Sequence, residues 1–76
     1  MNRMETTRQT LGNDLRKCRV ACGLTQTQAE QLSGMAGATL RDVEANRADP
    51  TLDTLQKLAT VYQVSIFLTV SPEVSE

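Results

Sequence analysis

The sequence contains no histidine and no tryptophan, and its 76 residues include one tyrosine, one phenylalanine and two cysteines. Without histidine, a nucleophilic serine or cysteine lacks its usual general base, so an enzyme is the least favoured class of protein. Two cysteines provide half of the ligands of a structural zinc site and are too few for a secreted disulfide framework. We therefore expect a protein without catalytic activity, metal or cofactor, in a reducing compartment.

Long apolar runs are missing as well. No segment approaches the roughly 18 apolar residues of a membrane span, and no hydrophobic stretch follows the charged residues near the N-terminus. We therefore expect a cytoplasmic protein that does not contact the membrane. A chain of 76 residues, 39% of them apolar, forms one small core, and such a core is marginal without further apolar contact. A partner subunit is the expected source of that contact.

Charged residues nearly balance, with 8 basic and 9 acidic side chains, but they are unevenly distributed. The basic groups predominate in residues 1–47 and the acidic groups in residues 48–76. A polyanion would therefore bind the first of these segments. An ordinary solvated surface explains the same charges equally well.

Apolar spacing predicts four helices. The first, over about residues 7–22, has apolar side chains at steps of three and four and ends at Gly23. Thr25 and Gln28 form a capping box that opens a second helix, which ends before Gly34. A third helix is expected over about residues 37–45. The fourth follows Pro50 and has the clearest apolar stripe of the chain, over residues 52–62.

After the fourth helix the apolar period changes to two, which predicts one strand over residues 64–70. A lone strand leaves backbone hydrogen-bonding groups without partners, so we predict that it pairs with the same strand of a second copy. The expected dimer contacts are Val64, Ile66, Phe67, Leu68 and Val70. The alternative is an extended tail packed on its own domain. Residues 1–6 and 71–76 are expected to be flexible ends.

Two short helices joined by a glycine turn are typical of the helix-turn-helix, whose second helix enters the DNA major groove. Between residues 24 and 52 the chain has Leu-Thr-Gln, a turn Gly followed by Met, Thr-Leu, Val-Glu and Pro-Thr-Leu, in that order. This series resembles the Cro and phage-repressor type of helix-turn-helix, the XRE family, over residues 11–64. The resemblance implies an all-α domain of four to five helices over residues 7–63, followed by the strand that pairs across the dimer.

The resemblance also implies roles for individual residues. Arg19 and Glu44 match a buried structural ion pair, and Thr25 and Gln26 match the phosphate-contacting start of the second helix. The remaining DNA-contacting positions are Ala36, Gly37, Ala38, Thr39, Arg41, Asp42, Asn46 and Arg47. The first three side chains are smaller than is usual in the family, so Arg41 and Asp42 are the expected polar readers of base edges.

A further departure is Glu30, which stands where the family has a small alanine between two helices. This acidic group is expected either to pair with Arg41 or to turn toward solvent.

A small domain followed by one strand and an acidic tail resembles the Hip-type antitoxins. This resemblance implies a sequence-specific repressor that binds an inverted-repeat operator in double-stranded DNA as a homodimer, regulates its own operon and binds a kinase-like toxin. The alternatives are a restriction-modification controller, a phage-type regulator, or a protein-interaction module that has lost DNA binding.

Overall fold

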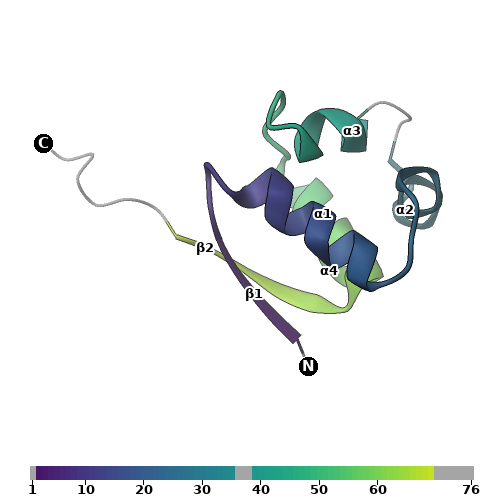
Figure 1. The fold of residues 1–76 in the computed structure, drawn as a ribbon, viewed down its shortest axis with the longest axis horizontal. Helices are drawn as coiled ribbons and strands as arrows, with labels where there is room; N and C mark the ends of the chain where they lie inside the picture. Colours follow the sequence, from purple (N-terminus) through teal and green to yellow (C-terminus); the bar gives the residue numbers. More distant parts are fainter. Residues whose placement is uncertain (1, 36–38, 70–76) are drawn as a thin grey trace, which may run out of the picture.

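The computed structural model of the protein describes residues 2–35 and 39–69. This part of the chain forms a cluster of helices with a parallel two-stranded sheet, and the sheet and α3 lie on opposite sides of α1 (Figure 1). The domain is therefore mixed rather than strictly all-α. In chain order the elements are β1 (Asn2–Thr7), α1 (Leu11–Ala21), α2 (Gln26–Ser33), α3 (Thr39–Glu44), α4 (Leu52–Tyr62) and β2 (Val64–Thr69).

Helix ends follow the local chemistry of the sequence. The Thr25 hydroxyl accepts a hydrogen bond from the backbone N–H of Gln28 (3.1 Å), and the Gln28 side chain accepts one from the Thr25 N–H (2.9 Å). These two bonds are the predicted capping box. Thr51 caps α4 by accepting from the Thr54 N–H. Gly34 takes the left-handed conformation that ends α2, with φ of +75°.

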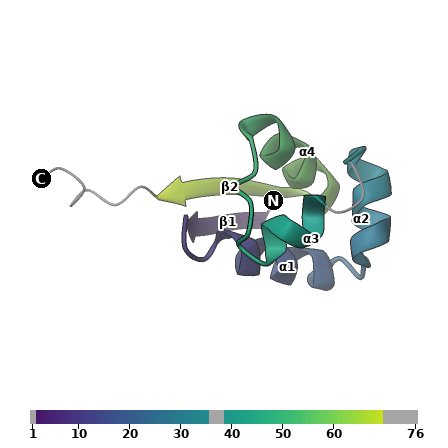
Figure 2. The same ribbon diagram turned by 90° about the horizontal axis from the view of Figure 1, so that it is seen from above.

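The strand β2 is not a lone strand. It pairs in parallel with β1, in a register that runs from Asn2 opposite Val64 to Thr7 opposite Thr69. The two strands lie side by side in both ribbon views (Figures 1 and 2). The expectation of a flexible N-terminus was therefore wrong for residues 2–6, and so was the argument that β2 needs a second copy to find a partner.

The first strand is held by a few specific contacts. Met4 and Thr6 are buried, whereas Arg3 lies on the opposite face with its guanidinium carbon 3.9 Å from the centre of the Phe67 ring. The Thr6 hydroxyl donates to the Asp14 carboxylate in α1 (2.8 Å). Because the strand occupies residues 2–7, α1 begins at Leu11 rather than near residue 7.

The core lies between the helices and is closed by the inner face of β1. Its buried apolar side chains are Met4, Leu11, Leu15, Ala29, Leu40, Val43, Leu58 and Tyr62.

None of the described helices is long and apolar enough to cross a membrane.

Candidate nucleic-acid interface

A buried ion pair joins the end of α1 to the end of α3. Arg19 Nε donates to Glu44 Oε2 at 2.7 Å and Arg19 Nη2 donates to Glu44 Oε1 at 3.1 Å. The two side chains are only 11% and 3% exposed. Arg19 Nη1 donates to the Leu24 carbonyl oxygen (2.8 Å), so all three guanidinium nitrogens are engaged inside the protein. This geometry gives Arg19 a structural role.

Gln26, at the start of α2, completes the same network. Its Nε2 donates to Glu44 Oε1 at 3.0 Å, so the end of its side chain points to the ion pair. Glu44, at the end of α3, is therefore joined to the end of α1 and to the start of α2 by charge-assisted hydrogen bonds. The hydrogen bond to Glu44 raises the pKa of Arg19 above its usual value. Burial, and then the nearby Glu44 charge, raise the pKa of Tyr62, which packs beside the pair.

A glycine sets the distance between α1 and α3. A Cβ atom at Gly12 would overlap the Val43 carbonyl oxygen, and it would lie 2.7 Å from Asn46 Oδ1 and 2.9 Å from the Glu44 carbonyl oxygen. Only a residue without a side chain fits at this contact. Together with the ion pair, Gly12 fixes the position of α3 on the domain.

The predicted phosphate contacts at the start of α2 are engaged within the protein. Thr25 uses its hydroxyl in the capping box, and Gln26 uses its amide in the network with Glu44. The first backbone N–H groups of a helix have no acceptor within that helix. At this end of α2, the groups offered to an anion are therefore backbone N–H groups rather than the two side chains.

The exposed side of α3 carries one cation, Arg41, that has no partner among residues 2–35 and 39–69. Arg41 is exposed and forms no hydrogen bond or ion pair with the residues described, and Thr39 is exposed at the start of the helix. Glu30 is half-buried and shows no ion pair in residues 2–35 and 39–69, so the expected pairing with Arg41 is not formed there.

Asp42 is paired with Arg47. Its Oδ1 accepts from Arg47 Nη2 at 3.1 Å and from Nε at 3.3 Å, and both side chains are largely accessible to solvent. Asp42 and Arg47 thus neutralise each other on the surface where base and phosphate contacts were predicted.

Asn46 turns toward α1. It has a φ of +60°, and its Nδ2 donates to the Gln9 carbonyl oxygen at 2.9 Å. This bond ties the turn after α3 to the segment before α1. The predicted positions Ala36, Gly37 and Ala38 lie outside the described residues.

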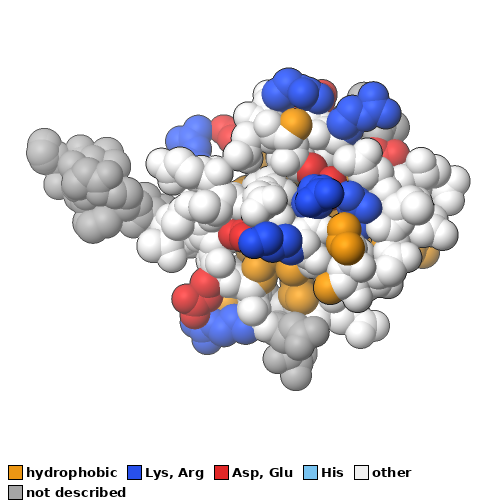
Figure 3. Space-filling model, in the orientation of Figure 1, with side chains coloured by type: hydrophobic (Ala, Val, Ile, Leu, Met, Phe, Trp, Pro, Cys, Tyr) orange, Lys and Arg blue, Asp and Glu red, His pale blue; other side chains and the backbone are white. Residues whose placement is uncertain are grey.

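Basic side chains are dispersed on the face that includes α3. Figure 3 shows Lys and Arg side chains near α3 at the top and over α1 in the centre, with acidic side chains close by. This face therefore offers individual cations to an anion rather than one continuous basic patch.

Residues 15–68 match a family model described as "Helix-turn-helix". The chain belongs to the helix-turn-helix family. This confirms the family indicated by the sequence motifs. The chain is 36% identical over 55 residues to the HTH-type transcriptional regulator PuuR of Escherichia coli (strain K12), and equally to that of Shigella flexneri. These matches cover 72% of this chain and span 30% of the length of each curated relative.

Two residues that shape this helix-turn-helix domain, Gly12 and Met4, give no signal in the sequence. Gly12 stands in the apolar pattern of α1 without any local sign of the close contact that it makes. Met4 stands among polar residues and gives no periodic signal, although it reaches the core. Both depend on segments distant in the sequence, so short-range patterns do not reveal them.

Proposed function

We propose that this helix-turn-helix protein binds double-stranded DNA in a sequence-specific manner and represses transcription. In this proposal α3 enters the major groove and Arg41 reads a base edge, because an arginine fits the two acceptors of guanine. The observation that carries the proposal is an exposed Arg41, unpaired within the described part of the chain, on a helix held by a buried network. A rigid helix with one uncommitted guanidinium suits direct readout better than general attraction to the DNA backbone.

The ion pairs of the other basic side chains predict a modest affinity for DNA. Arg19 is committed to Glu44, Arg47 to Asp42, and Arg8 to Asp49 at 2.8 Å. Few cations per chain are then available for phosphates, and the salt dependence of binding scales with the number of phosphates contacted. We therefore expect a shallow decrease of affinity with salt.

Substitution of Arg41 tests the proposed readout. Arg41→Ala is expected to weaken binding to the operator at least about fivefold and to relax the preference at one base pair in each half-site. Arg47→Ala should weaken binding to all sequences alike if the Arg47 guanidinium exchanges its exposed ion pair with Asp42 for the predicted phosphate contact. Fluorescence anisotropy with inverted repeats whose half-sites are about 10 base pairs apart measures both effects. Unchanged affinity and preference in Arg41→Ala would reject readout by this residue.

The proposed DNA-binding unit is a homodimer. A groove of about 690 Å³ lies between α4 and β2, and it is lined mainly by apolar side chains, including Leu52, Leu55, Ile66 and Leu68. Leu52 is 72% exposed and Leu68 is 45% exposed. Large accessible apolar side chains that line one groove support an interface, and a two-fold axis there presents two copies of α3 to one operator. The support is this groove, whose lining includes Val64, Ile66 and Leu68 among the predicted contacts. Phe67 does not line it, because its ring lies against the Arg3 guanidinium, and Val70 lies outside the described residues.

Acidic side chains introduced into the groove should abolish the dimer. Leu52→Glu combined with Leu68→Glu is expected to give a folded monomer, because both side chains are exposed in the single chain and carboxylates resist burial at an interface. Leu32→Glu is the matched control, since Leu32 is exposed on α2 and does not line the groove. Sedimentation at micromolar concentration measures the mass. A double variant that sediments as a dimer would move the interface elsewhere.

The finer role that we propose is that of a Hip-type antitoxin, which binds a kinase-like toxin and represses the operon that encodes both proteins. The support is the resemblance in domain size and in the strand that follows α4. Co-purification with the product of an adjacent kinase-like gene, combined with binding to DNA upstream of its own gene, tests this role. Binding to the upstream DNA without a toxin partner would favour a controller or phage-type regulator.

The Asp42–Arg47 pair favours a second candidate function. A neutralised surface and few free cations suit a module that binds protein and has lost DNA binding. In that case, micromolar protein would not shift the DNA upstream of its own gene at moderate salt.

A further inference from the structure

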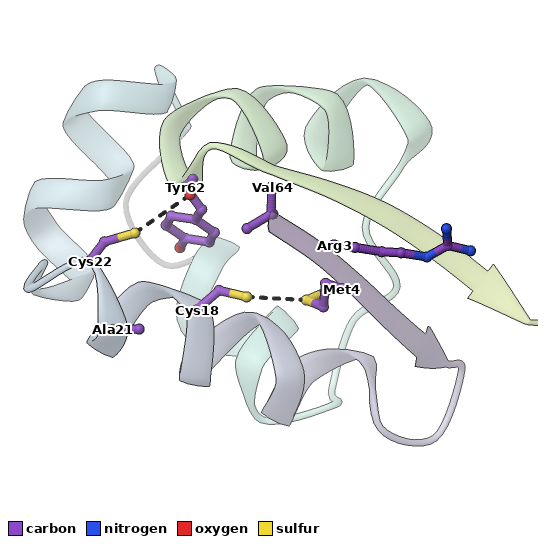
Figure 4. A pocket seen from close by; sticks show the side chains of 7 residues that line it. All are labelled: Arg3, Met4, Cys18, Ala21, Cys22, Tyr62 and Val64. Atoms are coloured by element: carbon purple, nitrogen blue, oxygen red, sulfur yellow. Dashed lines mark hydrogen bonds between the residues drawn. The ribbon is translucent and has the colours of Figure 1, made fainter. Parts of the chain in front are cut away.

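Three sulfur atoms, two from the C-terminal end of α1 and one from β1, line one small pocket. The pocket has a volume of about 330 Å³ and lies between α1, β1 and the end of α4. Cys18 and Cys22 enter it from α1 and its C-terminal end, and Met4 enters it from β1 (Figure 4). Both cysteines are free thiols. The Arg3 side chain extends away from the sulfur atoms, so no cation projects between them (Figure 4).

The sulfur atoms are held by weak partners only. Cys18 Sγ lies 3.3 Å from Met4 Sδ, and Cys22 Sγ lies 3.7 Å from the Tyr62 carbonyl oxygen. Thiols are weak donors and thioethers weak acceptors, so a metal ion would displace these contacts easily.

The spacing of the cysteines suits two ligands on one ion. Residues four apart on a helix have Cβ atoms about 5–6 Å apart on the same face, and Cys22, at the C-cap, still has helical backbone angles. Cys22 is exposed, so its side chain is free to rotate about χ1 toward Cys18. Such a rotation would turn the second sulfur atom away from the Tyr62 carbonyl oxygen and toward the contact between Cys18 and Met4.

The donor set excludes a zinc site and selects a softer ion. Within the described part of the chain, no three Cys, Asp or Glu side chains gather in a way that holds a metal. Two thiolates and a thioether are the ligands that Cu(I) prefers, and Cu(I) does not require four ligands.

We infer that Cys18, Cys22 and Met4 form a binding site for one Cu(I) ion per chain. Two S–H bonds break and two Cu–S(thiolate) bonds form, the two protons pass to solvent, and copper remains in the +1 state. The bound ion would link β1 to α1. This site does not depend on the proposed DNA binding.

Titration of the reduced protein with Cu(I), without oxygen and against bicinchoninate as a competing chelator, tests the site. We expect one Cu(I) per chain, which excess Zn²⁺ does not displace. Cys22→Ser should lower the affinity at least about 100-fold, because it removes a direct ligand, whereas loss of an outer partner alone lowers affinity 10–100-fold. Because Cys22 is exposed, this variant should melt at the temperature of the parent protein.

The methionine is tested separately. Met4→Leu is expected to lower Cu(I) affinity roughly tenfold, less than the loss of a thiolate, because the neutral thioether is the weaker of the two kinds of ligand. Met35→Leu is the matched control, since Met35 packs on the core outside this pocket and should leave the affinity unchanged. Equal affinity in Cys22→Ser and the parent, or one Cu(I) per two chains, would overturn the site. Equal affinity in Met4→Leu and the parent would overturn the assignment of its thioether.

Discussion

Replacement of Glu44 by alanine is expected to lower the free energy of unfolding by about 3–5 kcal/mol, the usual effect of leaving one partner of a buried ion pair without the other. The variant leaves the Arg19 guanidinium and the Gln26 amide without their acceptor inside the protein, because both donate to the Glu44 carboxylate. A domain of this size has a stability of about 5 kcal/mol, so about 0–2 kcal/mol would remain and up to about half of the variant would be unfolded near room temperature. Any loss of the proposed DNA binding would follow from unfolding.

Double-mutant cycles separate this interaction from general damage. Arg19→Ala and Glu44→Ala should be far less than additive in urea or thermal melts, and Glu44→Gln supplies a milder variant that retains a hydrogen-bond acceptor. The control is the Asp42–Arg47 pair, whose exposed side chains should contribute only about 0–1 kcal/mol. Full additivity of the Arg19 and Glu44 changes would contradict the pairing and would free Arg19 for contact with phosphate.

Gly12→Ala is expected to destabilise the protein by about 3 kcal/mol, although alanine is the better helix former. The added methyl group would overlap the Val43 carbonyl oxygen, which belongs to a backbone that cannot rotate away as a side chain would. Helix α3 must then move away from α1 or the helix ends must shift. We expect the folded fraction of this variant to bind DNA more weakly than the parent protein.

Asn13→Ala is the matched control for this prediction. It changes an exposed residue in the same turn of α1 and should alter stability by no more than about 0.5 kcal/mol. Urea unfolding compares the two variants, and anisotropy at saturating folded protein compares their affinities for DNA. A Gly12→Ala protein as stable as the parent would show that the contact between α1 and α3 relaxes freely.

The helices were predictable because each signal lies within one or two turns of the chain. The capping box at Thr25 and the glycine at residue 34 set the bounds of α2, and the apolar stripe of α4 includes the buried Leu58 and Tyr62. Leu52 belongs to the same stripe yet is exposed on the proposed dimer groove. Apolar periodicity marks the side that avoids water, but it does not distinguish a core from an interface.

The sheet and much of the surface were not predictable, because they depend on distant residues. Strand β1 carries one core side chain, Met4, and a single apolar residue has no period. The contact of Arg19 with Glu44 was implied by family motifs, whereas the hydrogen bond from Gln26 to Glu44 depends on how the helices are arranged in space. The same holds for Asn46, whose side-chain amide donates a hydrogen bond to the carbonyl oxygen of Gln9, 37 residues earlier in the chain.

The parallel pairing of β1 with β2 also bears on the order of folding. Each pair in this ladder joins residues about sixty positions apart, and closing a chain loop of that length costs roughly 3–4 kcal/mol of entropy beyond a constant. The helices between them rely on contacts that are closer in the sequence, so they are expected to assemble first and the ladder last. By the same reasoning β1 is the segment that opens most readily from the native state, uncovering the core beneath Met4 while the helices remain folded.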